Sequence, residues 1–236
     1  MNLILQAMAE EDRNVLEKSM TSMDIPRGEI LFEAGSKIER IYFVDSGVVS
    51  LVSLFSNGTT SEITTIGREG FVNVGSLLDD DLAIARHTMQ VAGSVRCINS
   101  DVLRHYVTGS ETLRGLLYRY TQTLIAQISQ TVACNNLHNA RQRLARWLLM
   151  THDRSEGDEL GLTQEFLAEM LGVRRPTVSE LARSLQNDGL ISYRRGRITI
   201  RDRPGLESCC CECHSIIRMQ YRRLLPELAR MEKPKH

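Results

Sequence analysis

Two adjacent arginines, Arg174 and Arg175, directly precede Pro176 at the start of a segment with helical spacing. An apolar stripe recurs behind them at intervals of three or four residues, formed by Val178, Leu181, Ala182 and Leu185. Proline is tolerated in a first helical turn, so the helix is predicted to begin near Arg174. Because positive charge at a helix N-terminus opposes the helix dipole, we expect the two guanidinium groups to face an anion.

The distribution of charge supports an anionic partner for this region. The chain of 236 residues has a formal net charge of zero and 42% hydrophobic residues, as in a water-soluble globular protein. Residues 1–138 carry 11 basic and 16 acidic side chains, whereas residues 139–206 carry 12 arginines, no lysine and 9 acidic side chains. Arginine binds phosphate and guanine in a bidentate manner, which favours recognition of a nucleic acid.

A second group of reactive side chains is the run "CCCECH" at 209–214. The candidate ligands for a zinc ion or a redox site are Cys210, Cys211, Cys213 and His214. Adjacent cysteines chelate one ion awkwardly, and no second cysteine pair completes the set, so we predict no metal here. We favour a C-terminal amphipathic helix that buries Cys209 and Cys213 as small apolar residues, together with Ile216 and Tyr221. Cys97 and Cys134 are likewise predicted to lie in the core.

The elements that precede these groups fall into a β-rich part and a helical part. Residues 2–20 predict a short amphipathic helix, and residues 25–99 alternate glycines with the runs "EILF", "IYFV", "VVSLVSLF", "SEITTI", "HTMQV" and "SVRCI". The sequence "SNGT" at 56–59 is typical of a hairpin turn. Short strands at this spacing predict a jelly-roll barrel.

The pattern becomes helical from about Ser100. One seam repeats every three or four residues through Leu113, Leu117, Tyr120, Leu124, Ile128, Thr131 and Asn135. A helix of this length packs partly on its own barrel, but we expect the seam also to contact a second copy of the chain. We place a hinge at 134–139, where Asn139 and Gln142 form a capping-box pattern, and predict an exposed loop at 151–159.

The segment "LTQEFLAEMLG" at 162–172 predicts a second helix, with Thr163 as its N-cap. Gly172 and Val173 then form a turn into the helix that begins near Arg174. The two helices and this turn make a helix-turn-helix. The following "SYRRGRITI" predicts two short strands, a wing with Arg195 and Gly196 at its tip.

Residues 24–206 resemble the Crp/Fnr family of bacterial transcription regulators, in the order of "GEILFEAG", "IYFVDSGVVSL", the long helix and the helix-turn-helix. The resemblance implies an α+β fold. The expected parts are an N-terminal helix and sensory jelly-roll barrel at 1–109, a dimerisation helix and hinge at 110–138, a winged helix-turn-helix at 139–206 and a cysteine-rich C-terminal helix at 207–236. It also implies double-stranded DNA, a second copy of the chain and RNA polymerase as partners. A cytoplasmic location is expected because the sequence shows neither a membrane span nor a signal peptide.

The resemblance assigns roles to residues of the recognition helix and wing. It implies that Arg175 pairs with guanine, and that other residues position phosphates or make secondary base contacts. The predicted DNA-binding set is Thr163, Arg174, Arg175, Pro176, Thr177, Ser179, Glu180, Arg183, Arg194, Arg195 and Arg197. Family members often carry glutamate where this chain has Pro176 and arginine where it has Glu180, so the operator sequence does not transfer unchanged.

The barrel departs from cyclic-AMP-binding relatives, in which a Gly-Glu pair binds the ribose and an Arg-Ser pair binds the phosphate. The Gly-Glu position corresponds to Asn73 and Val74, no Arg-Ser pair follows, and the acidic residues 79–81 disfavour an anion. Cyclic AMP in the usual mode is therefore not expected, and the effector is left unassigned. Arg86 and His87 are the candidates for another ligand, although surface positions at a strand entrance are the favoured interpretation.

Other functions are less consistent with the residues. The chain lacks the N-terminal cysteine cluster of iron–sulfur members of the family. A cupin-type metal enzyme needs several histidines inside the barrel, and only His87 and the nearby His105 are available, so no catalytic residues are predicted. A regulatory subunit that uses the winged helix for protein contacts remains an alternative, against which the arginine-led helix argues. No long apolar segment predicts a membrane span, and no signal peptide begins the chain.

Overall fold

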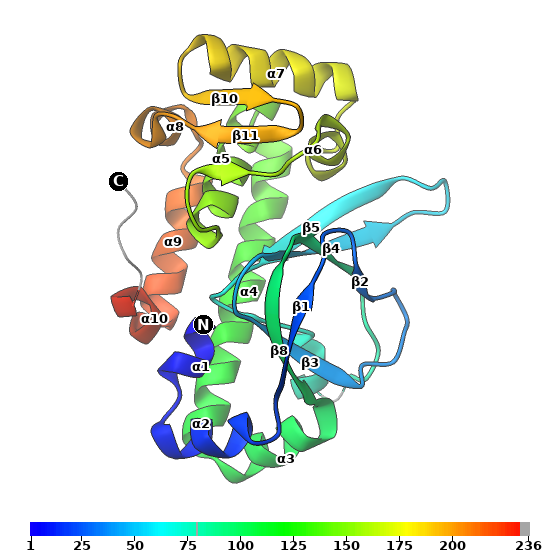
Figure 1. Cartoon of the computed structure of the whole chain (residues 1–236), viewed down its shortest axis with the longest axis vertical. Helices are drawn as coiled ribbons and strands as arrows, with labels where there is room; N and C mark the ends of the chain where they lie inside the picture. Colours follow the sequence, from blue (N-terminus) through cyan, green and yellow to red (C-terminus); the bar gives the residue numbers. More distant parts are fainter. Residues whose placement is uncertain (79, 232–236) are drawn as a thin grey trace.

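The computed structural model describes residues 1–78 and 80–231. A β-barrel and a helical C-terminal region both lie along one long helix, α4 (Glu111–Leu137), as Figure 1 shows. This arrangement confirms the predicted α+β fold, with an N-terminal barrel, a long helix and a C-terminal winged helix-turn-helix. Among the described residues, no helix combines the length and apolar character required to cross a membrane.

Two four-stranded antiparallel sheets form the barrel. One sheet has the order β1-β8-β3-β6 and contains Thr21–Ile25, Gly93–Asn99, Arg40–Val44 and Phe71–Val72. The other has the order β2-β7-β4-β5 and contains Ile30–Phe32, Arg86–Val91, Val48–Leu54 and Thr60–Ile66. A short 3₁₀ helix, η1 (Val74–Leu78), follows β6. This sheet pairing is that of a jelly roll.

The six predicted strand segments are all strands, and the hairpin turn at 56–59 joins β4 to β5, with Gly58 at a φ of 80°. Two details differ from the prediction. The N-terminal segment forms two helices, α1 (Leu3–Ala7) and α2 (Glu10–Glu17), separated by Met8 and Ala9. Strands β1 and β6 were not predicted: the side chains of β1 are mostly exposed and carry no clear apolar alternation, and β6 has only two residues.

Helices α3 (Ser100–Gly109) and α4 follow the barrel, and Ser110 caps α4 by accepting a hydrogen bond from the Leu113 amide. The predicted dimer seam on α4 packs mainly on the barrel of its own protomer. Its buried members are Leu113, Leu117, Tyr120, Leu124 and Thr131, whereas Ile128 is partly buried and Asn135 is exposed. Tyr120 lies so close to β6 that a Cβ added to Gly70 would stand 2.0 Å from its hydroxyl oxygen. The expected packing of the seam on its own barrel is therefore present, and the five buried members leave no apolar surface for a second copy.

The C-terminal region begins with α5 (Ala140–Arg154), and Asn139 and Gln142 form the predicted capping box at its start. The predicted exposed loop at 151–159 is partly wrong, because α5 continues to Arg154 and buries Thr151, His152 and Arg154. The remaining elements are β9 (Glu159–Leu160), α6 (Gln164–Leu171), α7 (Arg175–Asn187), β10 (Ile191–Arg194), β11 (Arg197–Ile200), α8 (Arg203–Cys209), α9 (Cys213–Leu224) and α10 (Pro226–Met231).

The described residues form two large apolar cores and one small one. The first fills the barrel and includes one face of α4, and the second lies among α5, α6, α7 and the three-stranded sheet β10-β11-β9. Helix α9 packs along α4, and α10 returns to α1 near the N-terminus (Figure 1). The third core consists of Cys134, Cys211 and Cys213, where α4 meets the segment between α8 and α9.

Candidate nucleic-acid interface

The turn between α6 and α7 has the geometry of a helix-turn-helix. Gly172 ends α6 in the left-handed conformation, with a φ of 63°, and the Val173 amide donates to the Ala168 carbonyl. A residue with a Cβ is strained at such an angle, which explains the glycine. Helix α7 buries Val178, Ala182 and Leu185, and thus turns its opposite face to solvent.

The N-terminus of α7 is exposed and open to an anion. Arg174 is the N-cap residue, its side chain makes no capping hydrogen bond, and no acidic residue occupies the first turn. The first amides of the helix therefore keep their capacity to donate. Arg175 forms an ion pair with Glu165, at 2.9 Å, but their side chains are 62% and 72% exposed. An ion pair this exposed contributes little free energy, so the Arg175 guanidinium can exchange Glu165 for another acceptor at little cost.

The other predicted contacts on the two helices differ in availability. Pro176, Glu180 and Arg183 are exposed, whereas Thr177 is half-buried. The Ser179 hydroxyl donates to Gln164 Oε1 at 2.9 Å, so it helps to hold α6 against α7. Thr163 caps α6 by accepting from the Phe166 amide at 3.3 Å.

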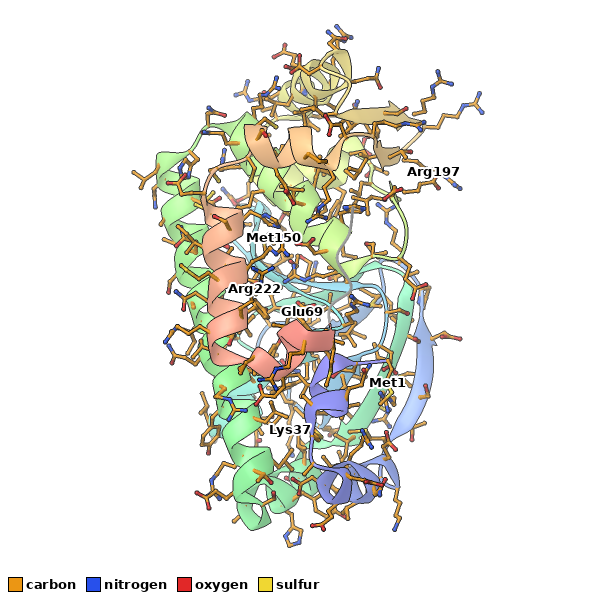
Figure 2. The ribbon with its side chains drawn as sticks, turned by 90° about the vertical axis from the view of Figure 1, so that its left-hand side faces the viewer. Met1, Lys37, Glu69, Met150, Arg197 and Arg222 are labelled. Atoms are coloured by element: carbon orange, nitrogen blue, oxygen red, sulfur yellow. The ribbon has the colours of Figure 1, made fainter. Side chains whose placement is uncertain are left out.

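The predicted wing is present. Strands β10 and β11 pair in antiparallel register, and Arg195 and Gly196 form the tip with φ angles of 48° and 75°. Arg194, Arg195 and Arg197 are all exposed, and Arg197 forms an exposed ion pair with Glu159 at 2.6 Å. Figure 2 shows Arg197 at the end of the molecule away from Lys37 of the barrel. The wing thus adds three cations beside the recognition helix.

Comparisons with known proteins match both halves of the chain. The Crp-like helix-turn-helix domain matches residues 142–209, and the cyclic nucleotide-binding domain matches residues 23–108. A CRP-like cAMP-activated global transcriptional regulator of Mycobacterium tuberculosis is 23% identical over 206 residues, which cover 84% of this chain and 92% of the relative. The chain belongs to the Crp/Fnr family.

Solved structures of Crp/Fnr proteins share the fold. The structure of FixK2 from Bradyrhizobium japonicum aligns with a TM-score of 0.70 at 17% identity and covers 81% of this chain and 98% of that one. A putative transcriptional regulator of the crp/fnr family from Eubacterium rectale aligns with a TM-score of 0.67 at 17% identity, over 87% of this chain and 96% of that one. The two domain matches and the curated relative identify the protein as a Crp/Fnr-family transcription regulator with a helix-turn-helix DNA-binding domain, which argues against the cupin-enzyme alternative.

The two candidate ligand residues of this Crp/Fnr barrel lie in different environments. Arg86 donates two hydrogen bonds to Glu33, at 2.8 and 3.1 Å, on the barrel surface. His87 is 1% exposed and packs edge-on against Phe32, so the expectation of a surface position was wrong for it. Burial lowers the pKa of His87 to about 4. The imidazole is therefore uncharged at neutral pH and offers an anion no positive charge.

Among the described residues of the stretch that corresponds to the ribose and phosphate contacts of cyclic-AMP-binding relatives, no two basic side chains form an exposed pair. Asn73 is buried, with a φ of 70°, and its side-chain amide nitrogen has no hydrogen-bond partner. Asp81 pairs with Arg104 of α3. Asp79, which contributes to the acidic run, lies outside the described residues.

A face of α4 that the sequence analysis missed is exposed. Tyr118, Ile125 and Val132 follow one another at intervals of seven residues and are 45%, 50% and 57% exposed. Gln122 and Ser129 lie between them and are also exposed. The alternating four- and three-residue spacing is that of a coiled-coil seam. The seven-residue spacing of Tyr118, Ile125 and Val132 can be read in the sequence, next to the longer apolar seam that faces the barrel.

The C-terminal cysteines do not form the candidate metal set considered from the sequence. His214 Nε2 hydrogen-bonds Asp153 Oδ2 at 2.9 Å, and the Cys210 thiol donates to the Cys211 carbonyl at 3.2 Å. Cys209 ends α8 and Cys213 begins α9, so the two do not lie on one helix as predicted. Cys97 and Cys134 are buried, at 5% and 0% exposed, as predicted.

Proposed function

We propose that the protein binds a two-fold-symmetric DNA site as a homodimer and reads its sequence with the N-terminus of α7. The observation that carries this proposal is the exposed, uncapped start of α7, which presents Arg174 and Arg175 beside three wing arginines. In helix-turn-helix proteins this end of the second helix enters the major groove. Arg175 then donates to guanine O6 and N7, and the wing contacts phosphates.

The exposed heptad on α4 supports the homodimer. Apolar residues at every seventh position of a long helix are covered best by an identical helix across a two-fold axis, where Tyr118, Ile125 and Val132 meet their copies. Such a pairing aligns two recognition helices for half-sites about one DNA turn, or ~34 Å, apart. A DNA target implies a cytoplasmic location, and RNA polymerase is the further partner that the family resemblance suggests.

Contacts between barrel and α6 offer a route for a signal. A pocket of about 250 Å³ lies between the barrel and α6 and is bordered by Arg86, Gln90 and Phe166. Gln90 is 3% exposed, and both polar atoms of its side chain lack a hydrogen-bond partner. A small molecule that satisfies this amide would contact both domains and change the position of the recognition helix. We propose this pocket as the effector site.

The test of sequence reading is Arg175→Ala. A site is first selected from a random duplex library with the wild-type protein, and dissociation constants are then measured for that site and for a scrambled duplex. Loss of one bidentate contact removes about 1–3 kcal/mol of discrimination in each half-site, a factor of roughly 5–150. The ratio of specific to non-specific affinity should therefore fall, while affinity for the scrambled duplex falls much less.

The control is Arg222→Ala, which removes an exposed arginine from α9 on another part of the molecule (Figure 2). It should leave the ratio unchanged. Equal losses on both duplexes for Arg175→Ala, or a library that yields no enriched sequence with the wild-type chain, would contradict the proposal.

The test of the dimer face is Ile125→Glu. It places two carboxylates opposite each other in a symmetric seam, so sedimentation velocity should show a monomer at concentrations where the wild type is a dimer. Ile84→Glu is the matched control, because Ile84 is an exposed isoleucine on the barrel, 76% exposed. A wild-type monomer, or a dimer that survives Ile125→Glu, would exclude this seam.

A further inference from the structure

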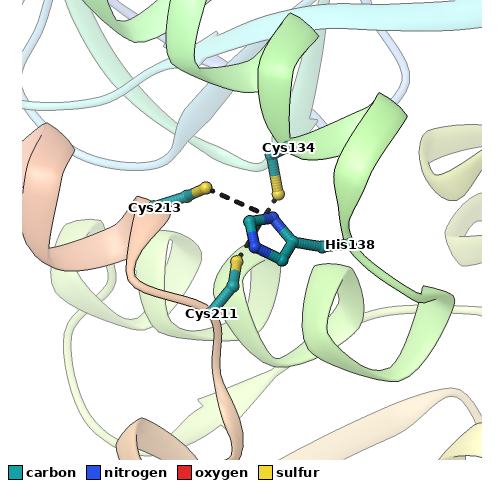
Figure 3. A group of neighbouring side chains, drawn as sticks. All are labelled: Cys134, His138, Cys211 and Cys213. Atoms are coloured by element: carbon teal, nitrogen blue, oxygen red, sulfur yellow. Dashed lines mark hydrogen bonds between the residues drawn. The ribbon is translucent and has the colours of Figure 1, made fainter.

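Four potential metal ligands converge at the junction of α4 with the segment between α8 and α9. They are Cys134, His138, Cys211 and Cys213, and their ligand atoms all lie within 4.8 Å of one another. Figure 3 shows the three thiols and the imidazole ring pointing toward a common centre. Cys134 and His138 stand one helical turn apart at the end of α4. Cys211 and Cys213 form a Cys-x-Cys pair that begins 77 residues after Cys134.

The distances fit one tetrahedral ion. With Zn–S bonds of about 2.3 Å and Zn–N bonds of about 2.0 Å, neighbouring ligand atoms in a tetrahedron are about 3.5–3.8 Å apart. Here Cys134 Sγ lies 3.5 Å from Cys211 Sγ, and Cys213 Sγ lies 3.5 Å from His138 Nδ1. The three thiols are nearly inaccessible, at 0%, 5% and 1% exposed for Cys134, Cys211 and Cys213. Three cysteines and one histidine are a known donor set of closed zinc sites.

The surrounding side chains orient these ligands. His138 Nδ1 faces the thiols, while its Nε2 lies 3.3 Å from Glu212 Oε2, the carboxylate–histidine pairing that commonly supports metal-bound imidazole. The Gln130 amide donates to Cys213 Sγ at 3.1 Å. Arg146, which is 5% exposed, places its positive charge near Cys134. The arrangement therefore provides both the ligands and their supporting hydrogen bonds.

We infer that Cys134, His138, Cys211 and Cys213 bind one Zn²⁺ ion. Each of the three thiols loses a proton to solvent as its sulfur bonds the ion, and His138 binds as the neutral ring through Nδ1. The net charge of the centre is then −1, which Arg146 partly balances. The bound ion joins the C-terminal end of α4 to the segment that follows α8, two parts of the chain that meet there through the three cysteines themselves.

The position of the site gives it a consequence for DNA binding, which rests on the function proposed above. His138 directly precedes Asn139, the N-cap of α5, so an ion at this point fixes the junction between the long helix and the DNA-binding region. Zinc should then hold one orientation of the recognition helices. Removal of the ion, or oxidation of its thiolates, should loosen that orientation and weaken specific DNA binding.

The experiment uses the full chain, reduced and freed of metal under anaerobic conditions. Titration with Co²⁺ should give the ligand-field and thiolate charge-transfer absorption of a tetrahedral site, with saturation at one ion per chain, and Zn²⁺ should displace it. Metal analysis after reconstitution should find one zinc per chain. The thermal midpoint should rise on zinc addition, since the ion binds the folded chain.

Variants distinguish the four ligands from their neighbours. Cys213→Ser and His138→Ala should abolish the tetrahedral Co²⁺ spectrum, and Glu212→Gln should weaken zinc binding by about 10–100-fold because the supporting carboxylate is removed. Cys209→Ser and Cys210→Ser are matched controls from the same run of cysteines and should bind zinc as the wild type does. Circular dichroism on every variant verifies that the chain is folded.

Several outcomes would overturn the inference. These are a wild-type chain that binds no Co²⁺ or Zn²⁺ after full reduction, binding that survives both Cys213→Ser and His138→Ala, and dependence on Cys209 or Cys210. A Cys134–Cys211 disulfide that forms in the presence of zinc would likewise exclude a stable metal centre. If zinc binds as expected while no duplex is bound by any form, the site stands and only its link to DNA fails.

Discussion

Nine of the 12 arginines at 139–206 fall into two groups with opposite surroundings. Arg146, Arg154 and Arg203 are 5%, 7% and 7% exposed. Arg154 and Arg203 form ion pairs, with Glu69 at 2.7 Å and with Asp153 at 2.6 Å. The second group is exposed and lies on α7 and the wing; it comprises Arg174, Arg175, Arg183, Arg194, Arg195 and Arg197. Arg154 thus joins α5 to the barrel and Arg203 joins α8 to α5. The second group is exposed to an anion, and its two ion pairs, Arg175 with Glu165 and Arg197 with Glu159, are themselves exposed.

This contrast changes how the arginine content of residues 139–206 is interpreted. A count of arginines alone suggests one large phosphate-binding surface, but some of these residues bind carboxylates inside the protein. A buried guanidinium needs several acceptors, and Arg154 finds them in Glu69, Thr65 and Gln127. Only burial separates the two groups, and burial depends on residues distant in sequence.

The largest expected effect is the loss of stability when an arginine of the buried group is replaced. Arg154→Met leaves Glu69 as an uncompensated buried carboxylate, which should lower the free energy of unfolding by about 3–5 kcal/mol. Urea unfolding monitored by circular dichroism measures the change. In a chain of this size the thermal midpoint should fall by roughly 6–20 °C. Arg175→Ala, by contrast, should leave both quantities within experimental error.

A double-mutant cycle sharpens the first prediction. Glu69→Gln removes the partner charge but keeps an acceptor for the Gly67 amide, which donates to Glu69 Oε1 at 3.0 Å. The double variant should be less destabilised than the sum of the two single variants, because neither buried charge is then left alone. Additive effects would show that Arg154 and Glu69 do not act as a pair.

The fold was largely predictable because its signals are local. Strand segments between glycines, the hairpin at Gly58, the Asn139 capping box and the Gly172 turn each depend on a few neighbouring residues. The exposed start of α7 was predictable for the same reason. Its apolar stripe faces the core, and a helix with one buried stripe must expose the residues opposite it.

The dimer seam and the cysteine cluster were not predictable in this way. The 27-residue helix α4 carries two stripes with nearly the same repeat, and periodicity alone does not say which stripe faces the barrel. The more apolar stripe was expected to contact both the barrel and a partner, but it covers the barrel and leaves the heptad of Tyr118, Ile125 and Val132 exposed. Cys134 and His138 meet Cys211 only through the packing of α9 along α4. A Cys-x₃-His spacing at a helix end was the one local sign of this cluster.

An effect of intermediate size, on DNA affinity, is expected when the exposed arginines of the wing are replaced. The triple variant Arg194→Ala, Arg195→Asn and Arg197→Ala should lower affinity for specific and scrambled duplexes by a similar factor. Asparagine is chosen at 195 because it tolerates the φ of 48° found there. The slope of log K against log salt should become shallower by about 0.9 for each phosphate that the wing no longer neutralises.

Stability of this wing variant should match the wild type, because these side chains are exposed. Titrations at several salt concentrations, with Arg222→Ala as the control, measure the slope. An unchanged slope would assign the wing a role other than phosphate binding.

The smallest expected effect tests whether a carboxylate at the contact between barrel and α5 behaves as a buried group. Glu62 of β5 accepts hydrogen bonds from Trp147 Nε1 at 2.9 Å and from the Ser50 hydroxyl at 3.0 Å. Desolvation raises its pKa from 4.5 to about 7. Between these two values the folded chain holds a proton that the unfolded chain has released, so stability falls as the pH rises from 4.5 to 7 and stays lower above it.

Glu62→Gln keeps an acceptor for Trp147 but cannot ionise, so it should remove this pH dependence. Its thermal midpoint should exceed that of the wild type at pH 8 by about 2–4 °C, the shift produced by 1 kcal/mol in a chain of this size. The difference should shrink toward pH 5, where the folded wild-type residue is already protonated. Scanning calorimetry at the two pH values measures it, with the exposed Glu180→Gln as the control. If the difference in thermal midpoint grows toward pH 5 instead, Arg146 and Arg154 stabilise Glu62 as a carboxylate. Glu62 would then belong with the buried paired charges, such as Glu69.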